Sequence, residues 1–502
     1  MAVSPHRTRD DAIRLGGPAR DEGPVPAAAD PPGAGRRWLA VAVVLLAGAL
    51  ATECAVIAQP GPLPGGPAVL YLALGWWALA LAAVAALVRA APRRGVTAVL
   101  LVGAVAVHLL ALTSGPRMSD DLYRYAWDGK VSAAGIDPYH YATNSAELAG
   151  LRDSWLWPDP VGCAALGRGS GCTRINYPTA HTIYPPVAQA YFVAVHHLPG
   201  PPRENKIQLY VAVLSLLLTG LLIRVLPRFG HHPGLAAAYA WGPSAGIDIG
   251  MDGHVDVLAV IFAVAALALL ARPGARPRPR PRPTTRTAAA AGALLGAAVA
   301  VKLYPALLLP AAARRRPVAV LGAAAAVVGL SYLPHVAAVG TDVVGFLPKY
   351  LSVEGYAQGH RFLLLGLLGL TGTAAKVAAG AVLAGVVLAV WRSEPARLPV
   401  ERGALWLVGA AFLVATPAQP WYGVLLVALA VLAGRLEWAA VAVGPYVLYM
   451  ALFRDLAVED VYARPGGYVL GAAAVALTAA VRRIRARSSG APGWPAASRC
   501  AR

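Results

Sequence analysis

The chain has 502 residues, of which 57% are hydrophobic and only 14% are charged. Soluble proteins carry roughly 25% charged residues, so this composition excludes an ordinary soluble protein and predicts an all-α polytopic membrane protein. The net charge of +19 does not indicate a nucleic-acid partner, because the arginines cluster in short loops between apolar runs, as cytoplasmic loops of membrane proteins do.

The first part of the chain sets the expected orientation. Residues 1–36 are charged and rich in proline and alanine, which predicts a disordered cytoplasmic tail. Apolar runs follow at about 38–58, 67–89 and 96–114, each close to the roughly 20 residues that a bilayer crossing needs. With Arg36 and Arg89 on the cytoplasmic side, three crossings bring the chain outside by residue 115.

Residues 115–184 are expected to form a long, structured extracytoplasmic loop. The segment holds nine aromatic residues, too many for a disordered loop. Its part 119–134 has helical character and is ended by Gly135 and Pro138. We therefore expect a short helix lying on the membrane surface.

Two of the four cysteines, Cys163 and Cys172, share this loop. If the loop is extracytoplasmic, a disulfide between them is expected. The alternative is a pair of unrelated thiols.

Beyond the loop, apolar runs predict a bundle of about 13–14 transmembrane helices within residues 37–484. The run 185–198 is too short for an easy crossing, and parity favours a shallow or re-entrant segment. An Arg-Pro repeat at 272–287 marks a cytoplasmic loop, and residues 485–502 form a cytoplasmic tail. Lys302 falls at the turn of an apolar hairpin whose two ends lie inside.

Asp120 and Asp121 stand where an apolar run meets water, and carboxylates placed there lose solvation energy. A carboxylate within hydrogen-bond reach of a hydroxyl can act as a general base. Neighbouring helical residues point about 100° apart, so only one of the two is expected to enter a site. The alternative is helix capping, because Ser119, Asp120 and Asp121 all suit a helix N-terminus. Position alone favours neither interpretation.

On the expected helix, Asp121, Arg124, Tyr125 and Asp128 lie on one face. Arg124 is one turn from Asp120, and such an exposed pair contributes only about 0.3–0.5 kcal/mol. Arg124 is thus a candidate ligand for a phosphate and Tyr125 for a sugar, whereas Asp128 is expected to be a solvated residue.

Three further basic residues are candidate phosphate ligands. Lys302 is the strongest, because an ammonium group at membrane depth is costly, although snorkelling to the interface is the alternative. His360 and Arg361 begin an apolar run from the outside and suit a phosphate or a lipid headgroup equally well.

His254 lies between Asp252 and Asp256, and these residue types also ligate divalent cations. Three residues on one segment are weak evidence for a metal, so no metal site is predicted. The favoured interpretation is that His254 contacts the donor and Asp256 a sugar, or that both make helix-end hydrogen bonds.

Aromatic residues supply candidate sugar contacts at Tyr184, Trp421 and Tyr422. For Trp421 and Tyr422 the alternative is a belt of interfacial aromatic side chains. For Tyr184, which precedes two prolines, the alternative is setting the angle at which the next segment enters.

These residues occur in short motifs that follow one another over about 115–425: Ser119-Asp-Asp-Leu-Tyr-Arg-Tyr125, Gly135-Ile-Asp-Pro-Tyr139, Tyr184-Pro-Pro186, Gly253-His-Val-Asp256, Lys302-Leu-Tyr-Pro305 and Pro420-Trp-Tyr422. With them the chain resembles the GT-C superfamily of membrane glycosyltransferases. Within it, the chain is similar to the polyprenyl-phosphate-mannose-dependent mannosyltransferases of glycosyltransferase family 87 and their actinobacterial relatives.

The resemblance implies a GT-C-like helical bundle whose first long extracytoplasmic loop carries the catalytic aspartate. It also implies an inverting transfer of a sugar from a β-linked polyprenyl phosphate to an acceptor hydroxyl. That role falls on Asp120 or Asp121, and the face shared with Arg124 and Tyr125 favours Asp121.

The predicted function is therefore a polyprenyl-phosphate hexose transferase of the cell membrane, with an extracytoplasmic active site and with mannose implied by the resemblance alone. The expected partners are the lipid-linked donor, a glycolipid or polysaccharide acceptor and the bilayer. The sequence makes no cofactor certain, and a divalent cation stays the alternative. The alternatives are a transporter or flippase of a lipid-linked sugar, which should show paired broken helices, and a scaffold protein of envelope assembly.

Overall fold

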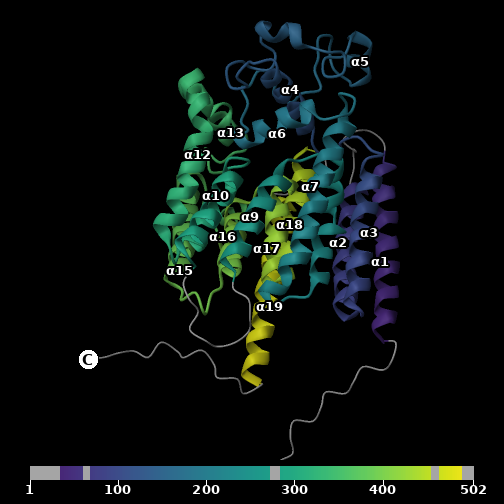
Figure 1. Cartoon of the computed structure of the whole chain (residues 1–502), viewed down its shortest axis with the longest axis vertical. Helices are drawn as coiled ribbons and strands as arrows, with labels where there is room; N and C mark the ends of the chain where they lie inside the picture. The colour runs from purple at the N-terminus through teal and green to yellow at the C-terminus, as the bar shows by residue number, and fades with distance from the viewer. Residues whose placement is uncertain (1–33, 60–67, 272–282, 454–462, 489–502) are drawn as a thin grey trace, which may run out of the picture.

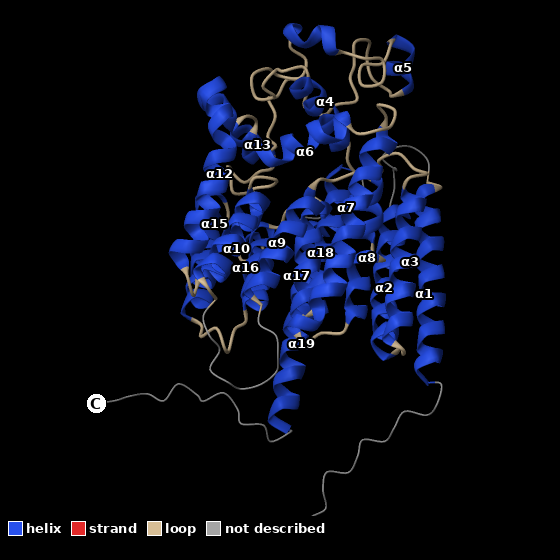
Figure 2. Ribbon diagram, in the orientation of Figure 1, coloured by secondary structure: helices blue, strands red, loops and turns tan. Residues whose placement is uncertain are grey.

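The computed structural model describes residues 34–59, 68–271, 283–453 and 463–488. Every regular element among these residues is a helix (Figure 2), so the predicted all-α class is confirmed. The predicted tail 1–36, the Arg-Pro loop 272–287 and the tail 485–502 lie mostly outside the described residues. Helices reach into both tails, because α1 begins at Ala34 and α19 ends at Ser488.

Seven helices in the described part of the chain are long and apolar enough to cross a membrane, which makes the chain a multi-pass membrane protein. They are α1 (Ala34–Ile57), α2 (Ala68–Arg89), α3 (Arg93–Ala111), α7 (Glu204–Val225), α12 (Pro317–Val339), α15 (Gly372–Arg392) and α19 (Ala463–Ser488). A crossing needs about 20 residues, and each of these meets or approaches that length.

Shorter helices complete the bundle. They are α8 (Ala237–Ala240), the π-helix η4 (Ser244–Met251), α9 (Asp256–Leu270), α10 (Thr285–Val299), η5 (Tyr304–Leu308), α11 (Leu309–Ala313), α16 (Val400–Ala415), η7 (Pro420–Tyr422), α17 (Gly423–Ala433) and α18 (Ala439–Phe453). The count of 13–14 transmembrane helices included several of these short segments, and it stays a prediction.

The burial of the helices follows their composition. All residues of α17 are apolar apart from Gly423, and every one of them is buried, as expected for a helix at the centre of a bundle. In contrast, α12 exposes Leu330 and Leu333, and α15 exposes Val377 and Leu388. Because these exposed side chains are apolar, we infer that α12 and α15 form part of the surface that meets lipid.

One end of the molecule carries four short helices, of which the first and the last line the candidate site. They are α4 (Asp121–Ala133), α5 (Pro160–Ala165), α6 (Pro186–His197) and α13 (Leu347–Val353), and they lie at the end opposite to the last turns of α19 (Figure 1). The predicted helix 119–134 is thus present as α4, and Gly135 follows it with φ of 78°.

α6 has 12 residues, fewer than a membrane crossing needs. It packs on α4 at Gly129, where an added Cβ would stand 2.5 Å from the carbonyl oxygen of Phe192. Only glycine allows this approach, and the contact joins the helix that begins at the carboxylate pair to the segment that follows the loop.

Candidate active site

A cavity of about 900 Å³ opens beneath α4 and α13, within the size range of ligand sites. Its wall comes from the start of α4, the segment 176–185, the turn between α10 and η5, α13 and η7. Seven of the twelve residues singled out in the sequence line it: Asp120, Asp121, Arg124, Tyr184, Lys302, Trp421 and Tyr422. Segments far apart in the chain therefore meet at one site.

Asp120 and Asp121 stand at the N-terminus of α4, but the side chain of Asp120 makes no capping hydrogen bond. The backbone N–H of Asp121 donates instead to the Ser119 hydroxyl, at 3.2 Å. Ser119 therefore accepts from the first N–H of the helix, and both carboxylates remain available to the cavity.

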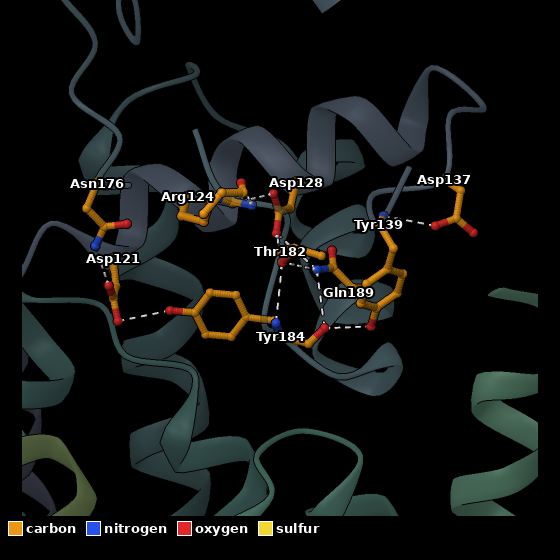
Figure 3. A network of polar contacts seen from close by, with 10 residues as sticks. Asp121, Arg124, Asp128, Asp137, Tyr139, Asn176, Thr182, Tyr184 and Gln189 are labelled. Carbon is orange, nitrogen blue, oxygen red and sulfur yellow. Dashed lines mark hydrogen bonds and ion pairs between the residues drawn. The ribbon is translucent and has the colours of Figure 1, made fainter. Parts of the chain in front are cut away.

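Asn176 ties the two carboxylates together. Its Nδ2 donates to Oδ1 of Asp120 at 3.0 Å and to Oδ1 of Asp121 at 2.7 Å. The hydroxyl of Tyr184 donates to the other oxygen of Asp121 at 2.9 Å (Figure 3). Both oxygens of Asp121 are thus fixed by donors from the segment 176–184, and each keeps lone-pair capacity for a further hydrogen bond.

The surroundings of Asp120 differ. Burial and the negative charge of Asp121 raise the pKa of Asp120 to about 6, against the lowering effect of Arg168 and Asn176. The guanidinium of Arg168 lies 3.8 Å from Asp120, in the segment enclosed by a Cys163–Cys172 disulfide. The predicted disulfide is therefore present, and the segment that it closes brings the positive charge of Arg168 to Asp120.

Lys302 occupies the turn between α10 and η5, as predicted. Its Nζ lies 3.2 Å from Oδ2 of Asp256, the first residue of α9. The same ammonium stands over the rings of Tyr184 and Tyr422, 5.1 and 5.5 Å from their centroids. Since Tyr184 also donates to Asp121, one tyrosine links the ammonium group to the carboxylate.

Three of the predicted residues stand behind the wall of the cavity. His254 is fully buried and stacks on Trp421, with ring centroids 4.0 Å apart. Its Nδ1 lies 3.3 Å from the hydroxyl of Tyr125 and 3.8 Å from Oδ2 of Asp121. Tyr125 and the buried Asp256 likewise do not line the cavity. Each of the three contacts a residue of the cavity wall and so helps to hold it in place.

His360 and Arg361 are also absent from the cavity wall. Arg361 instead pairs with Glu354 at 2.8 Å, and Glu354 does line the cavity. The guanidinium of Arg361 is therefore directed at Glu354. The sequence thus identified Arg361, which pairs with a residue of the cavity wall but does not belong to the wall itself. No group of three His, Cys, Asp or Glu in the described part of the chain is arranged to hold a metal ion.

Asp128 is buried and not solvated as expected, and Arg124 pairs with it instead of with Asp120, whereas the phosphate role of Arg124 stays a prediction. Arg124 pairs with Asp128 at 2.9 Å, and both side chains are buried. Asp128 also accepts hydrogen bonds from Thr182 and Gln189 (Figure 3). An i,i+4 pair is compatible with either a solvated or a buried face, and no pattern in the sequence indicated that the segment 182–189 would cover this one.

Asp252 positions the chain just before the carboxylate pair. Its Oδ1 accepts from the backbone N–H groups of Arg117 and Met118, at 2.6 and 2.9 Å. The residue follows the π-helix η4, and such helices often occur at functional sites. Asp252 thus fixes the approach of the backbone to Asp120.

Residues 182–417 match the family model of glycosyltransferase family 87. The chain carries a glycosyltransferase family 87 domain. No curated protein and no solved structure matches the chain. The family 87 domain supplies Tyr184, Lys302 and Glu354 to the cavity, whereas Asp120 and Asp121 precede it. The resemblance seen in the short motifs is thereby confirmed at the level of the family, and the chain is a glycosyltransferase.

Proposed function

We propose that this glycosyltransferase moves a hexose, mannose according to the resemblance, from a polyprenyl phosphate to an acceptor hydroxyl on the extracytoplasmic side of the cell membrane. The observation that carries the proposal is the meeting of Asp121 and Lys302 in one cavity with an apolar edge. A carboxylate can take a proton from the acceptor, and an ammonium group can hold the departing phosphate.

The apolar edge suits the lipid part of the donor. Leu303, Leu307 and Pro310 line the cavity beside Lys302, together with Val387 of α15. Leu303 is 42% exposed, so this edge continues to the outer surface of the bundle. A prenyl chain lying here would bring its phosphate to Lys302 while its hydrocarbon stays out of water.

The geometry favours Asp121 as the general base. The acceptor oxygen attacks the anomeric carbon as its proton passes to Asp121, and the bond between that carbon and the phosphate oxygen breaks. The electron pair leaves with the polyprenyl phosphate, whose charge Lys302 offsets. Attack from the face opposite to the leaving group inverts the anomeric carbon, so a β-linked donor gives an α-linked product.

Two features support an extracytoplasmic site. The Cys163–Cys172 disulfide belongs to the loop at the cavity, and disulfides persist in oxidising compartments. At the other end of the molecule, the last turn of α19 carries Arg485 and Arg487 (Figure 1), as the positive-inside rule requires of a cytoplasmic end.

The test is sugar transfer by the full chain reconstituted in liposomes, with a synthetic polyprenyl-phosphate mannose as donor. General bases contribute about 10²–10⁴-fold, so Asp121→Asn should lower kcat by about a hundredfold or more. Asp153→Asn is the matched control, because Asp153 lies in the same loop and pairs with Lys130 away from the cavity. Equal turnover in the two variants would show that Asp121 is not the base.

A further inference from the structure

One wall of the cavity is a continuous row of aromatic side chains. Tyr177 contacts Phe346 with ring centroids 5.0 Å apart, and Phe346 contacts Tyr350 at 6.4 Å. The hydroxyl of Tyr350 is 2.9 Å from that of Tyr422, whose ring lies 6.1 Å from that of Trp421. All five residues line the cavity.

The row runs from water to the buried floor. Tyr177 is 48% exposed, whereas Trp421 is 6% exposed. Tyr177 also has φ of 43°, a left-handed conformation that is costly for a residue with a large side chain and is often retained at functional sites. Because Tyr177 belongs to the long polar loop 115–184, we infer that the exposed end of the row lies at a mouth that faces water.

The two halves of the row have different neighbours. Tyr422 and Trp421 lie with Lys302, where the donor phosphate is proposed to bind. Tyr177 follows Asn176, which holds both carboxylates. The outer half, Tyr177, Phe346 and Tyr350, thus leads from water to the proposed base, and this is the path that an acceptor must take.

The chemistry of the outer half suits an uncharged polyhydroxyl ligand. Aromatic rings pack against the C–H faces of pyranose rings, as they do against other apolar surfaces. Asp120, Asp121 and Glu354 line the same region and disfavour an anionic acceptor. His181 also lines it, and its Nδ1 bonds the carbonyl of Tyr139 at 2.8 Å, which leaves Nε2 as an acceptor for a sugar hydroxyl.

We infer that the outer aromatic row binds the acceptor, and that the acceptor is an uncharged glycan of two or more linked hexoses. Three rings in succession cover more length than a single pyranose needs. The inference rests on the proposed function for the direction of transfer, but it assigns binding residues that the base and the phosphate ligand do not include.

The experiment uses octyl glycosides carrying one, two or three α-linked mannose units as acceptors for the full chain in liposomes. Wild-type KM should fall with each added sugar. Tyr177→Ala should raise KM for the trisaccharide by about tenfold and flatten the dependence on length, with the KM of the donor unchanged. Tyr177→Phe, which keeps the ring, should recover most of the lost affinity. Tyr141→Ala is the control, because Tyr141 lies in the same loop but does not line the cavity.

Equal effects of Tyr177→Ala on the one-sugar and three-sugar acceptors, or an effect on the KM of the donor alone, would overturn the inference. Binding of the trisaccharide, followed by tryptophan fluorescence without donor, separates it from the proposed function. If wild type transfers no mannose but binds the trisaccharide about tenfold more tightly than Tyr177→Ala does, the proposed reaction fails and the glycan site stands. Equal binding by the two proteins rejects the glycan site.

Discussion

Adjacent carboxylates that share one amide donor have unequal surroundings in this site. Asp121 is held at both oxygens, by Asn176 and by Tyr184. Asp120 shares only the Asn176 contact and lies 3.8 Å from the exposed Arg168. The residue with the fixed geometry is the better base, since proton transfer depends on position before basicity. The other then acts through its charge.

This division predicts a specific pH dependence. Burial and the charge of Asp121 raise the pKa of Asp120 from 3.8 to about 6, so Asp120 is neutral below that pH and negative above it. The negative charge of Asp120 favours movement of the acceptor proton toward the carboxylate pair, and kcat/KM should therefore fall as pH decreases through about 6. Asp120→Asn is neutral at every pH, so it should lack this inflection and run about tenfold below wild type at pH 8.

The measurement is a pH profile of kcat/KM between pH 5 and 9 for both proteins, bracketing the value of about 6. Retention of the wild-type inflection in Asp120→Asn would assign it to another group. Complete loss of turnover in Asp120→Asn, with activity kept in Asp121→Asn, would exchange the roles of the two aspartates.

Sequence reasoning found the charged residues of the site more easily than the neutral ones. Asp120, Asp121 and Lys302 stand out because ionisable groups beside apolar runs are costly. Asn176 lies in a loop with many other polar residues, so its residue type carried no signal. Asp128 was misjudged because its burial depends on Thr182 and Gln189, which reach it only through the fold.

At the scale of elements, the cavity depends on how closely α13 is held to the segment that follows Asn176. Gly345 precedes α13 with φ of 56°, and an added Cβ there would stand 1.9 Å from the carbonyl oxygen of Thr182. The atoms that the added Cβ would meet belong to the backbone, so no flexible side chain can move aside to relieve the clash. This approach keeps Phe346 and Tyr350 against the cavity.

Gly345→Ala should therefore separate α13 from this segment and lower both stability and transfer. Gly340→Ala is a matched control, because Gly340 has φ of 60° but no atom within 4 Å of an added Cβ. Both variants carry the backbone cost of a left-handed alanine, about 1–3 kcal/mol. Overpacking adds about 1–3 kcal/mol in Gly345→Ala alone. Thermal unfolding in detergent should thus show a lower midpoint for Gly345→Ala; equal midpoints would mean that the approach is not tight.

Elements with a distinct boundary signal were predictable, and those inside apolar runs were not. α4 is polar, begins after Ser119 and ends before Gly135, and the sequence indicated both limits. Polar residues also marked two interruptions of the apolar runs. Asp252 lies at the break between η4 and α9, and Lys302 lies at the turn between α10 and η5. Composition does not decide the number of crossings. A run such as α17 is as apolar as a membrane span but has only 11 residues.

At the scale of the whole molecule, the cavity has two sides that suit two different substrates. Leu303, Leu307 and Val387 line one side, next to the exposed apolar surface of α15. Tyr177 and Asn176 line the other, next to the loop closed by the disulfide. A lipid-linked donor and a water-borne acceptor can then meet at Asp121 without crossing each other, which is the arrangement that a transfer reaction at a membrane surface needs.

Narrowing the apolar side should affect the donor alone. Val387 lines the cavity, whereas its neighbour Leu388 does not and is 46% exposed; adjacent helical residues point about 100° apart. Val387→Trp should raise the KM of a long-chain polyprenyl donor by about tenfold, because the indole fills the space for the prenyl chain. The KM of a donor with a short prenyl chain should rise less, and that of the acceptor should stay unchanged. Leu388→Trp adds the same side chain to the lipid-facing surface and should leave all three values near wild type. An equal rise for long and short donors, or a rise in the KM of the acceptor, would show that the prenyl chain does not lie between η5 and α15.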